Sequence, residues 1–118
     1  MRAVTYYLAS TFHVAHAHNK RGHRWADDPA ALANMTANVP RTMAQSCAFI
    51  EETCALSPFV MGDAMTLADP WLFTICTWLK GDGVDITDYP KLAAHFAMMA
   101  ARPSVAAVRD LGLLPKDT

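Results

Sequence analysis

The chain has 118 residues, of which 53% are hydrophobic and 18% are charged, and its formal net charge is −1. This length corresponds to a single domain, and the near-zero charge argues against bulk electrostatic attraction to nucleic acid or to an anionic membrane. No apolar run is long enough to cross a membrane, and the N-terminal residues lack the apolar core of a signal peptide. The three cysteines form no paired motif, so we expect reduced, buried thiols in a cytoplasmic protein.

The first part of the chain has helical periodicity and is expected to form a helix that ends near Asn19. One stripe of this helix is apolar and begins at Val4. A second face is mixed in character and is suited to contact a ligand; it carries Tyr6, Ser10, His13 and Ala17.

A second helix is expected to start at Asp28 and Pro29, because Asp is a favoured N-cap and Pro is tolerated at the first helical position. Apolar residues then keep one helical phase as far as Cys54. Pro40 lies within this run without shifting the phase, so we expect one long helix that bends at Pro40. Cys47 and Cys54 fall on the same stripe and are interpreted as core residues.

Thr66 and Asp69 have the spacing of a capping box, in which each side chain accepts a hydrogen bond from the other residue's backbone N–H. The helix behind this box is apolar around nearly its whole circumference, which is typical of the middle of a bundle. It is expected to end at Gly81-Asp82-Gly83. Its aromatic residues are therefore expected in the core; they are Trp71, Phe73 and Trp78. Asp69 is interpreted as a cap and not as a catalytic acid.

Two further helices are expected, opening at Pro90 and at Pro103, the latter ending near Gly112. Five helices without a strand predict an all-α fold, a five-helix bundle.

The order of three motifs resembles the C-terminal domain of the glutathione transferase family. The segment 59–70 carries an aromatic residue, Gly-Asp and Thr-Leu-Ala-Asp, and the segments 89–92 and 99–105 resemble two later signatures of the family. Residues 7–13 are similar to the first helix of this domain in bacterial beta-class members. The resemblance covers the whole chain, which predicts a single domain over residues 1–118.

The resemblance implies a parent protein in which a thioredoxin-fold domain binds glutathione and the helical domain lines the pocket of an apolar electrophile. Because the sequence begins at Met1, no such domain is expected in this polypeptide. We therefore expect these residues to act as a module that binds an apolar ligand or docks to a partner, with glutathione as a possible co-substrate and no other cofactor. The alternatives are a split or truncated transferase that is active with a separate thioredoxin-fold chain, and a structural assembly domain. A homodimer that buries faces of the first two helices is also expected.

His13 is the leading candidate for a site residue, because it matches the beta-class position whose imidazole lies near the glutathione thiol. Tyr6 and Ser10 share its face in a regular helix and complete the expected ligand-binding set. His13 and His16 are three residues apart, but no carboxylate or cysteine stands at ligand spacing beside them, so no metal site is expected. The histidines are instead interpreted as solvated, including His18 and His23.

Overall fold

The computed structural model describes residues 1–115 and 117–118, and within these residues the regular elements are all helical. Helix α1 (Arg2–Tyr7), a π-helical turn (Leu8–Phe12) and helix α2 (His13–Lys20) follow one another without a break and form the first helical rod. The other helices are α3 (Pro29–Thr53), α4 (Ala68–Cys76), α5 (Pro90–Ala100) and α6 (Pro103–Asp110). The expected all-α fold with five helices is therefore confirmed.

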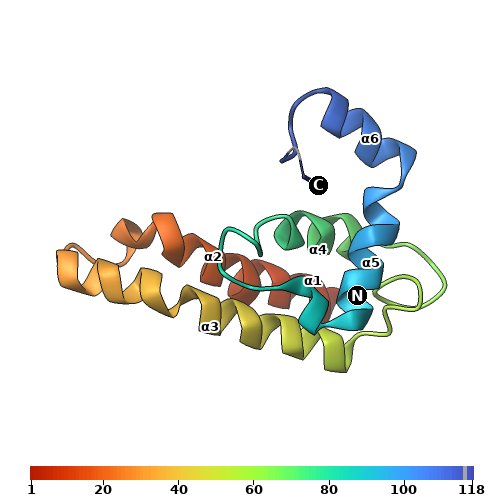
Figure 1. Ribbon diagram of the computed structural model, residues 1–118. Coiled ribbons are helices and arrows are strands. Elements are labelled where there is room, and N and C mark those ends of the chain that lie inside the picture. The colour runs from red at the N-terminus through yellow and green to blue at the C-terminus, as the bar shows by residue number, and fades with distance from the viewer. Residues whose placement is uncertain (116) are drawn as a thin grey trace.

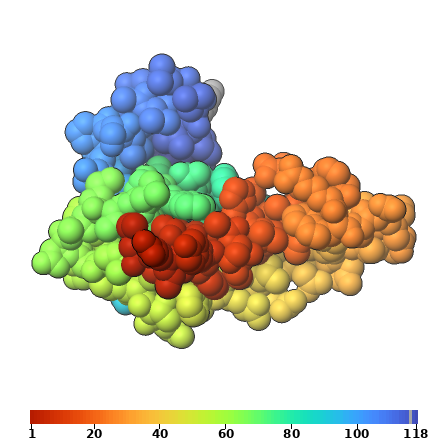
Figure 2. Space-filling view, turned by 180° about the vertical axis from the view of Figure 1, so that it is seen from behind, coloured from red at the N-terminus to blue at the C-terminus, as the bar shows by residue number. Residues whose placement is uncertain are grey.

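Helix α2 runs beside the first half of α3, and together they form the long arm of the molecule (Figure 1). Helix α4 lies in the middle of the other end, with contacts to both α1 and α5. Helix α6 forms a lobe at one side of the bundle (Figure 2), and its Val105 packs in a cluster with Phe73 of α4. Within the described residues, no helix combines the length and the apolar character needed to cross a bilayer.

Helix α3 confirms the expectation of one long helix. The Asp28 side chain accepts the Ala30 N–H at 3.1 Å, Pro29 occupies the first position, and the helix continues through Pro40. Pro40 is also where the turn after α4 approaches α3 closely. A Cβ atom added to Gly83 would lie 3.1 Å from Pro40 Cγ, and Gly83 has a φ of 81°, so both space and backbone conformation favour glycine there.

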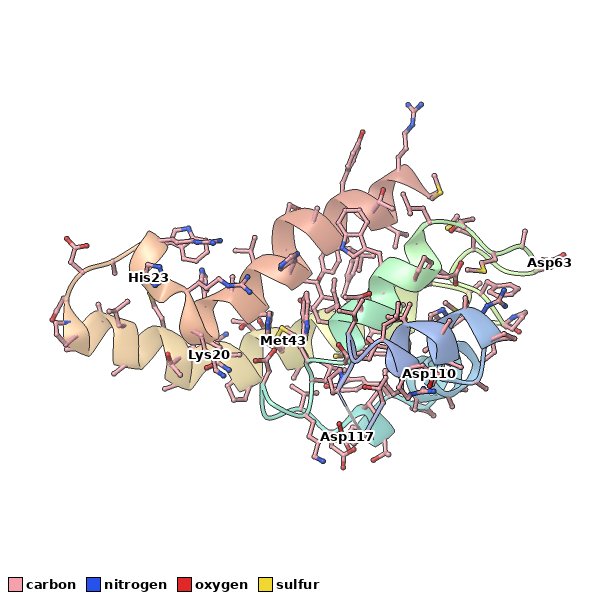
Figure 3. All side chains as sticks on the ribbon, turned by 90° about the horizontal axis from the view of Figure 1, so that it is seen from above. Lys20, His23, Met43, Asp63, Asp110 and Asp117 are labelled. Atoms are coloured by element: carbon pink, nitrogen blue, oxygen red, sulfur yellow. The ribbon has the colours of Figure 1, made fainter. Side chains whose placement is uncertain are left out.

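The core lies where α1, α2, α3, α4 and α5 meet. Met43 is fully buried between these helices, at the centre of the molecule (Figure 3). The three cysteines are free and buried, as expected, and burial raises the pKa of the Cys47 thiol to about 12. The thiols therefore act as small apolar side chains in the core.

The aromatic residues of the α4 segment are less buried than expected. Phe73 lies in a small core cluster with Met99 and Val105, but Trp71 and Trp78 are only half-buried. Helix α4 also ends at Cys76, earlier than the expected stop at Gly81, and the chain continues as tight turns. Trp78 lies in these turns, where its ring contacts helix α2.

The predicted capping box forms in part. The Asp69 carboxylate accepts the Thr66 N–H at 2.8 Å, as expected. The Thr66 hydroxyl, however, accepts the Ala68 N–H at 3.3 Å, while the Asp69 N–H donates to the Thr66 carbonyl at 3.1 Å. The chain enters α4 through a tight turn, which brings the N–H of Ala68 and not that of Asp69 to the hydroxyl.

Asp69 also has contacts that the capping motif does not predict. Its side chain is fully buried, and it accepts the Val60 N–H at 2.8 Å from the preceding loop. Nε2 of His95, which is fully buried in α5, lies 2.9 Å from the same carboxylate oxygen. One carboxylate thus connects the loop before α4, the start of α4 and helix α5.

We predict that Asp69→Ala lowers the free energy of unfolding by about 3–5 kcal/mol, because it leaves a buried histidine and two backbone N–H groups without their acceptor. Thr66→Ala is expected to cost about 1 kcal/mol, the usual loss for one cap. Asp28→Ala is the matched control, since Asp28 is an exposed N-cap carboxylate with a single bond, and should also cost about 1 kcal/mol. Urea midpoints measure all three, and equal losses for Asp69 and Asp28 would contradict this account.

Candidate functional site

The indole of Trp78 is in contact with two histidines of α2. The His16 ring stacks on it with a centroid distance of 4.2 Å and an interplanar angle of 14°. The His13 ring is tilted by 49° at a centroid distance of 5.0 Å. Because His13 and His16 are one helical turn apart, both can reach the same indole. The result is a wall of three rings between α2 and the turn after α4.

A buried carboxylate holds His16 in this position. Asp82 is 3% exposed, and its Oδ2 lies 2.5 Å from Nδ1 of His16. Its other oxygen accepts a hydrogen bond from the Asn19 side chain at 2.8 Å. A carboxylate at Nδ1 favours a proton on that nitrogen, which leaves Nε2 as the nitrogen that can interact with other groups. Asp82 therefore fixes the orientation of the ring, with a proton on Nδ1.

A hollow of about 320 Å³ lies beside this wall. The exposed residues Lys20 and Arg21 line it together with His16, Trp78 and Asp82. Lys20 is the last residue of α2 and is labelled in Figure 3. The hollow thus combines an aromatic wall with two cationic side chains, a combination suited to an organic anion or to a polar molecule with an apolar part.

The surroundings of His13 lower the pKa of its imidazole. Burial disfavours the charged form, and the positive charges of His16 and Arg21 add to this effect. His13 therefore remains neutral to a lower pH than an ordinary histidine. A neutral imidazole can donate or accept a hydrogen bond, and the same positive surroundings favour an anion beside it.

Of the predicted site residues, only His13 belongs to the ring wall. Tyr6 is 68% exposed, and the Ser10 hydroxyl donates to the Tyr6 carbonyl at 2.7 Å within the helix. Ser10 lines a different hollow, of about 310 Å³, together with residues of α3 such as Gln45. The π-helical turn explains the separation. It has more residues per turn than an α-helix, so Ser10 and His13 diverge around the axis. A ligand-binding role for these three residues remains a prediction.

The histidines are less uniformly solvated than expected. His16 is paired with Asp82, and the His18 ring packs edge-on against Trp25 with a centroid distance of 4.5 Å. His23 is exposed at the far end of the arm (Figure 3). Across the described residues, no group of three or more His, Cys, Asp or Glu side chains is arranged to hold a metal ion.

Comparison with known proteins supplies the family. Residues 8–103 match the family described as the glutathione S-transferase C-terminal domain. The chain belongs to this family. The fold also matches a crystal structure of a glutathione transferase homologue from Sulfitobacter with bound glutathione, with 52% sequence identity and a TM-score of 0.93. The match covers 96% of this chain and 54% of that one, so this glutathione transferase domain spans about half the length of its solved relative. No curated protein matches the chain.

Sequence reasoning missed Asp82, Asn19 and the pairing of His16. The segment Gly81-Asp82-Gly83 was interpreted only as a helix stop, although an acidic residue between two glycines is unusual enough to be a candidate. Asp82 and His16 are 66 positions apart, and no local pattern connects them. The burial of Asp82 and its pairing with His16 are evident only in the folded structure.

We predict that His16→Gln raises the pKa of His13, because it removes a positive charge that opposes protonation. Arg21→Gln should raise it by less, since Arg21 is the smaller of the two charge effects. His18→Gln is the control, because the His18 ring lies against Trp25 and not beside His13. Histidine pKa values from NMR titration test this, and an unchanged His13 pKa in His16→Gln would contradict the assignment.

The lowered pKa of His13 also has a consequence for stability. The folded state favours the neutral imidazole of His13. The contribution of this group to the free energy of unfolding is therefore fully present above the unfolded pKa of about 6.5, and it is lost as the pH falls through the pKa of His13 in the folded state.

Proposed function

We propose that this chain is the helical half of a glutathione transferase. In this role it supplies the wall for an apolar electrophile beside glutathione, which a thioredoxin-fold domain binds. The observation that carries the proposal is the 52% identity, over 96% of this chain, with a homologue that contains bound glutathione. At this identity, the backbone that places His13 and Trp78 is expected to be shared.

The ring wall supports this role physically. Trp78 offers an apolar face for an electrophile, and the neutral imidazole of His13 can donate a hydrogen bond to a sulfur anion. The nearby charge of Arg21 favours the ionised thiol over the neutral one. None of the chain's own cysteines suits this chemistry, because burial raises the pKa of all three thiols.

A surface for the glutathione-binding domain is available near the N-terminus. The beginning of α1 lies beside the loop that precedes α4 (Figure 2), and both carry exposed apolar side chains. They include Met1 at 49% exposure and Leu67 at 64%. Clustered exposed apolar residues are typical of interaction surfaces. We propose that the thioredoxin-fold domain, linked or separate, docks here.

A polypeptide of these 118 residues alone is expected to give no conjugation of glutathione to 1-chloro-2,4-dinitrobenzene above the uncatalysed rate. Joining it to the part of the Sulfitobacter homologue that it does not cover should restore turnover. In that chimera, His13→Ala should reduce kcat/KM by about tenfold or more, as loss of one anion-stabilising donor does. The control His18→Ala should leave it within about twofold, because His18 packs against Trp25.

Two outcomes would contradict the proposal. One is turnover by the 118-residue polypeptide alone. The other is a folded chimera that binds glutathione by calorimetry but shows equal activity with and without His13.

We further propose a homodimer through the face shared by α1, α2 and α3. Phe49 is 44% exposed on this face and stacks on Tyr7 with a centroid distance of 4.3 Å. The hollow that Ser10 lines lies on the same face. In a two-fold arrangement, each copy would fill the hollow of the other.

Sedimentation equilibrium should give twice the chain mass of 12.9 kDa at micromolar concentration. Phe49→Glu should shift the protein to monomer, because it places a charge in the apolar contact. Leu111→Glu is the control, since Leu111 is 73% exposed beyond α6 and away from this face. A monomeric wild type, or a dimer that survives Phe49→Glu, would contradict the interface.

A further inference from the structure

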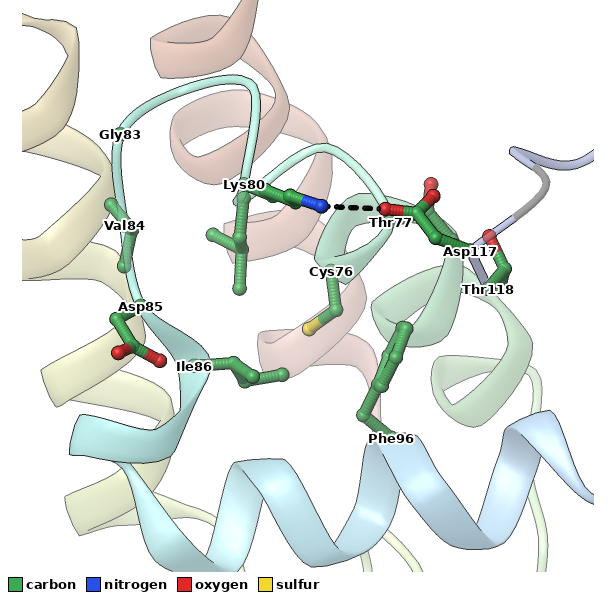
Figure 4. A pocket seen from close by; sticks show the side chains of 11 residues that line it. Cys76, Thr77, Lys80, Gly83, Val84, Asp85, Ile86, Phe96, Asp117 and Thr118 are labelled. Carbon is green, nitrogen blue, oxygen red and sulfur yellow. Dashed lines mark hydrogen bonds and ion pairs between the residues drawn. The ribbon is translucent and has the colours of Figure 1, made fainter.

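Another hollow lies apart from the one beside the ring wall. It measures about 540 Å³ and lies between the end of α4, the segment 83–86 and α5 (Figure 4). Thr77 is the only lining residue that it shares with the hollow beside Trp78. The two hollows therefore lie on different sides of the same turn, and a ligand in one leaves the other free.

The inner surface of this hollow is apolar and firmly held. Leu79 is 1% exposed and Val84 is 9% exposed, so both belong to the main core. The Phe96 ring stacks on Phe73 with a centroid distance of 5.1 Å and an interplanar angle of 24°, which fixes one aromatic wall. Because these side chains are packed from behind, the inner side of the hollow is fixed, while the exposed pair of Lys80 and Asp117 borders its outer side.

The Cys76 side chain points into the space between Phe96 and Ile86 (Figure 4). Burial raises the pKa of this thiol well above its ordinary value, so it remains neutral and behaves as an apolar surface. The hollow therefore offers a ligand dispersion contacts and burial of apolar area, and Cys76 supplies no thiolate.

The charged groups at the rim are already paired. Lys80 Nζ lies 3.0 Å from the Asp117 carboxylate, which closes one side of the hollow (Figure 4). The Asp85 carboxylate accepts the Thr87 N–H at 2.9 Å and the Thr87 hydroxyl at 2.7 Å. Each of the three charged side chains that line the hollow thus has a partner, and a charged ligand would have to compete with those contacts.

We propose that this hollow is a second ligand site, separate from the ring wall of His13 and Trp78, and that it binds a neutral, flat aromatic molecule. A volume of about 540 Å³ accommodates two or three rings, and pockets of this size and apolar character are those that hold small ligands. The fixed ring of Phe96 favours a flat aromatic partner by stacking.

The test uses the fluorescence of N-phenyl-1-naphthylamine, a neutral probe that joins a naphthalene and a phenyl ring, with the purified chain. We expect saturable binding that Ile86→Trp weakens by roughly tenfold or more, since the larger ring occupies the hollow. Val108→Trp adds the same ring at a 38% exposed position on α6 that does not line the hollow, and should leave the affinity within about twofold. His13→Ala should also leave it within about twofold, because His13 does not line the hollow.

Two further measurements keep the proposal falsifiable if Ile86→Trp does not fold. In the wild type, NMR shifts caused by the probe should centre on Ile86, Phe96 and Leu79. The anionic analogue 8-anilinonaphthalene-1-sulfonate should bind roughly tenfold more weakly, because the rim offers no unpaired cation among its lining residues. Absence of saturable binding, shifts centred on His13 and Trp78, or equal affinity for the anion would each overturn the proposal.

Discussion

The buried carboxylate of Asp69 is the interaction on which the arrangement of the helices most depends. It accepts N–H groups from Val60 and Thr66 and faces Nε2 of His95, so it joins a loop, the start of α4 and the middle of α5. A buried carboxylate is costly unless hydrogen-bond donors replace its hydration, and these three groups do so. The carboxylate therefore fixes the position of α4 relative to the preceding loop and to α5.

The position of α4 in turn determines both ligand-sized hollows. Trp78 follows its last turn and meets His13 and His16 on one side, and Cys76 faces the larger hollow on the other. A second buried carboxylate, Asp82, then attaches the turn after α4 to α2 through His16 and Asn19. Helix α4 is therefore held by a carboxylate–histidine pair at each end, and the chemistry-bearing side chains lie around its C-terminal end.

The features that could be predicted from the sequence are those encoded within a few residues. The cap at Asp28, the continuity of α3 through Pro40, and the reach of Asp69 back to Thr66 depend on local geometry alone. The partners of the buried carboxylates could not be predicted in this way, because His95 is 26 residues from Asp69 and His16 is 66 residues from Asp82. The π-helical turn could not be predicted either, because residues 8–12 have no sequence pattern that distinguishes a π-helix from an α-helix. This turn is what separates Ser10 from His13 around the helix axis.

Amide hydrogen exchange at Val60 and Thr66 tests the role of Asp69 most directly. Both residues lie outside regular helices, and their N–H groups donate to a carboxylate instead of a carbonyl. If Asp69 holds the bundle together, these two amides should exchange only when the whole domain unfolds, at the same free energy as the buried α4 amide of Leu72. Exchange of Val60 and Thr66 at the rate of an exposed loop, while Leu72 stays protected, would contradict this account.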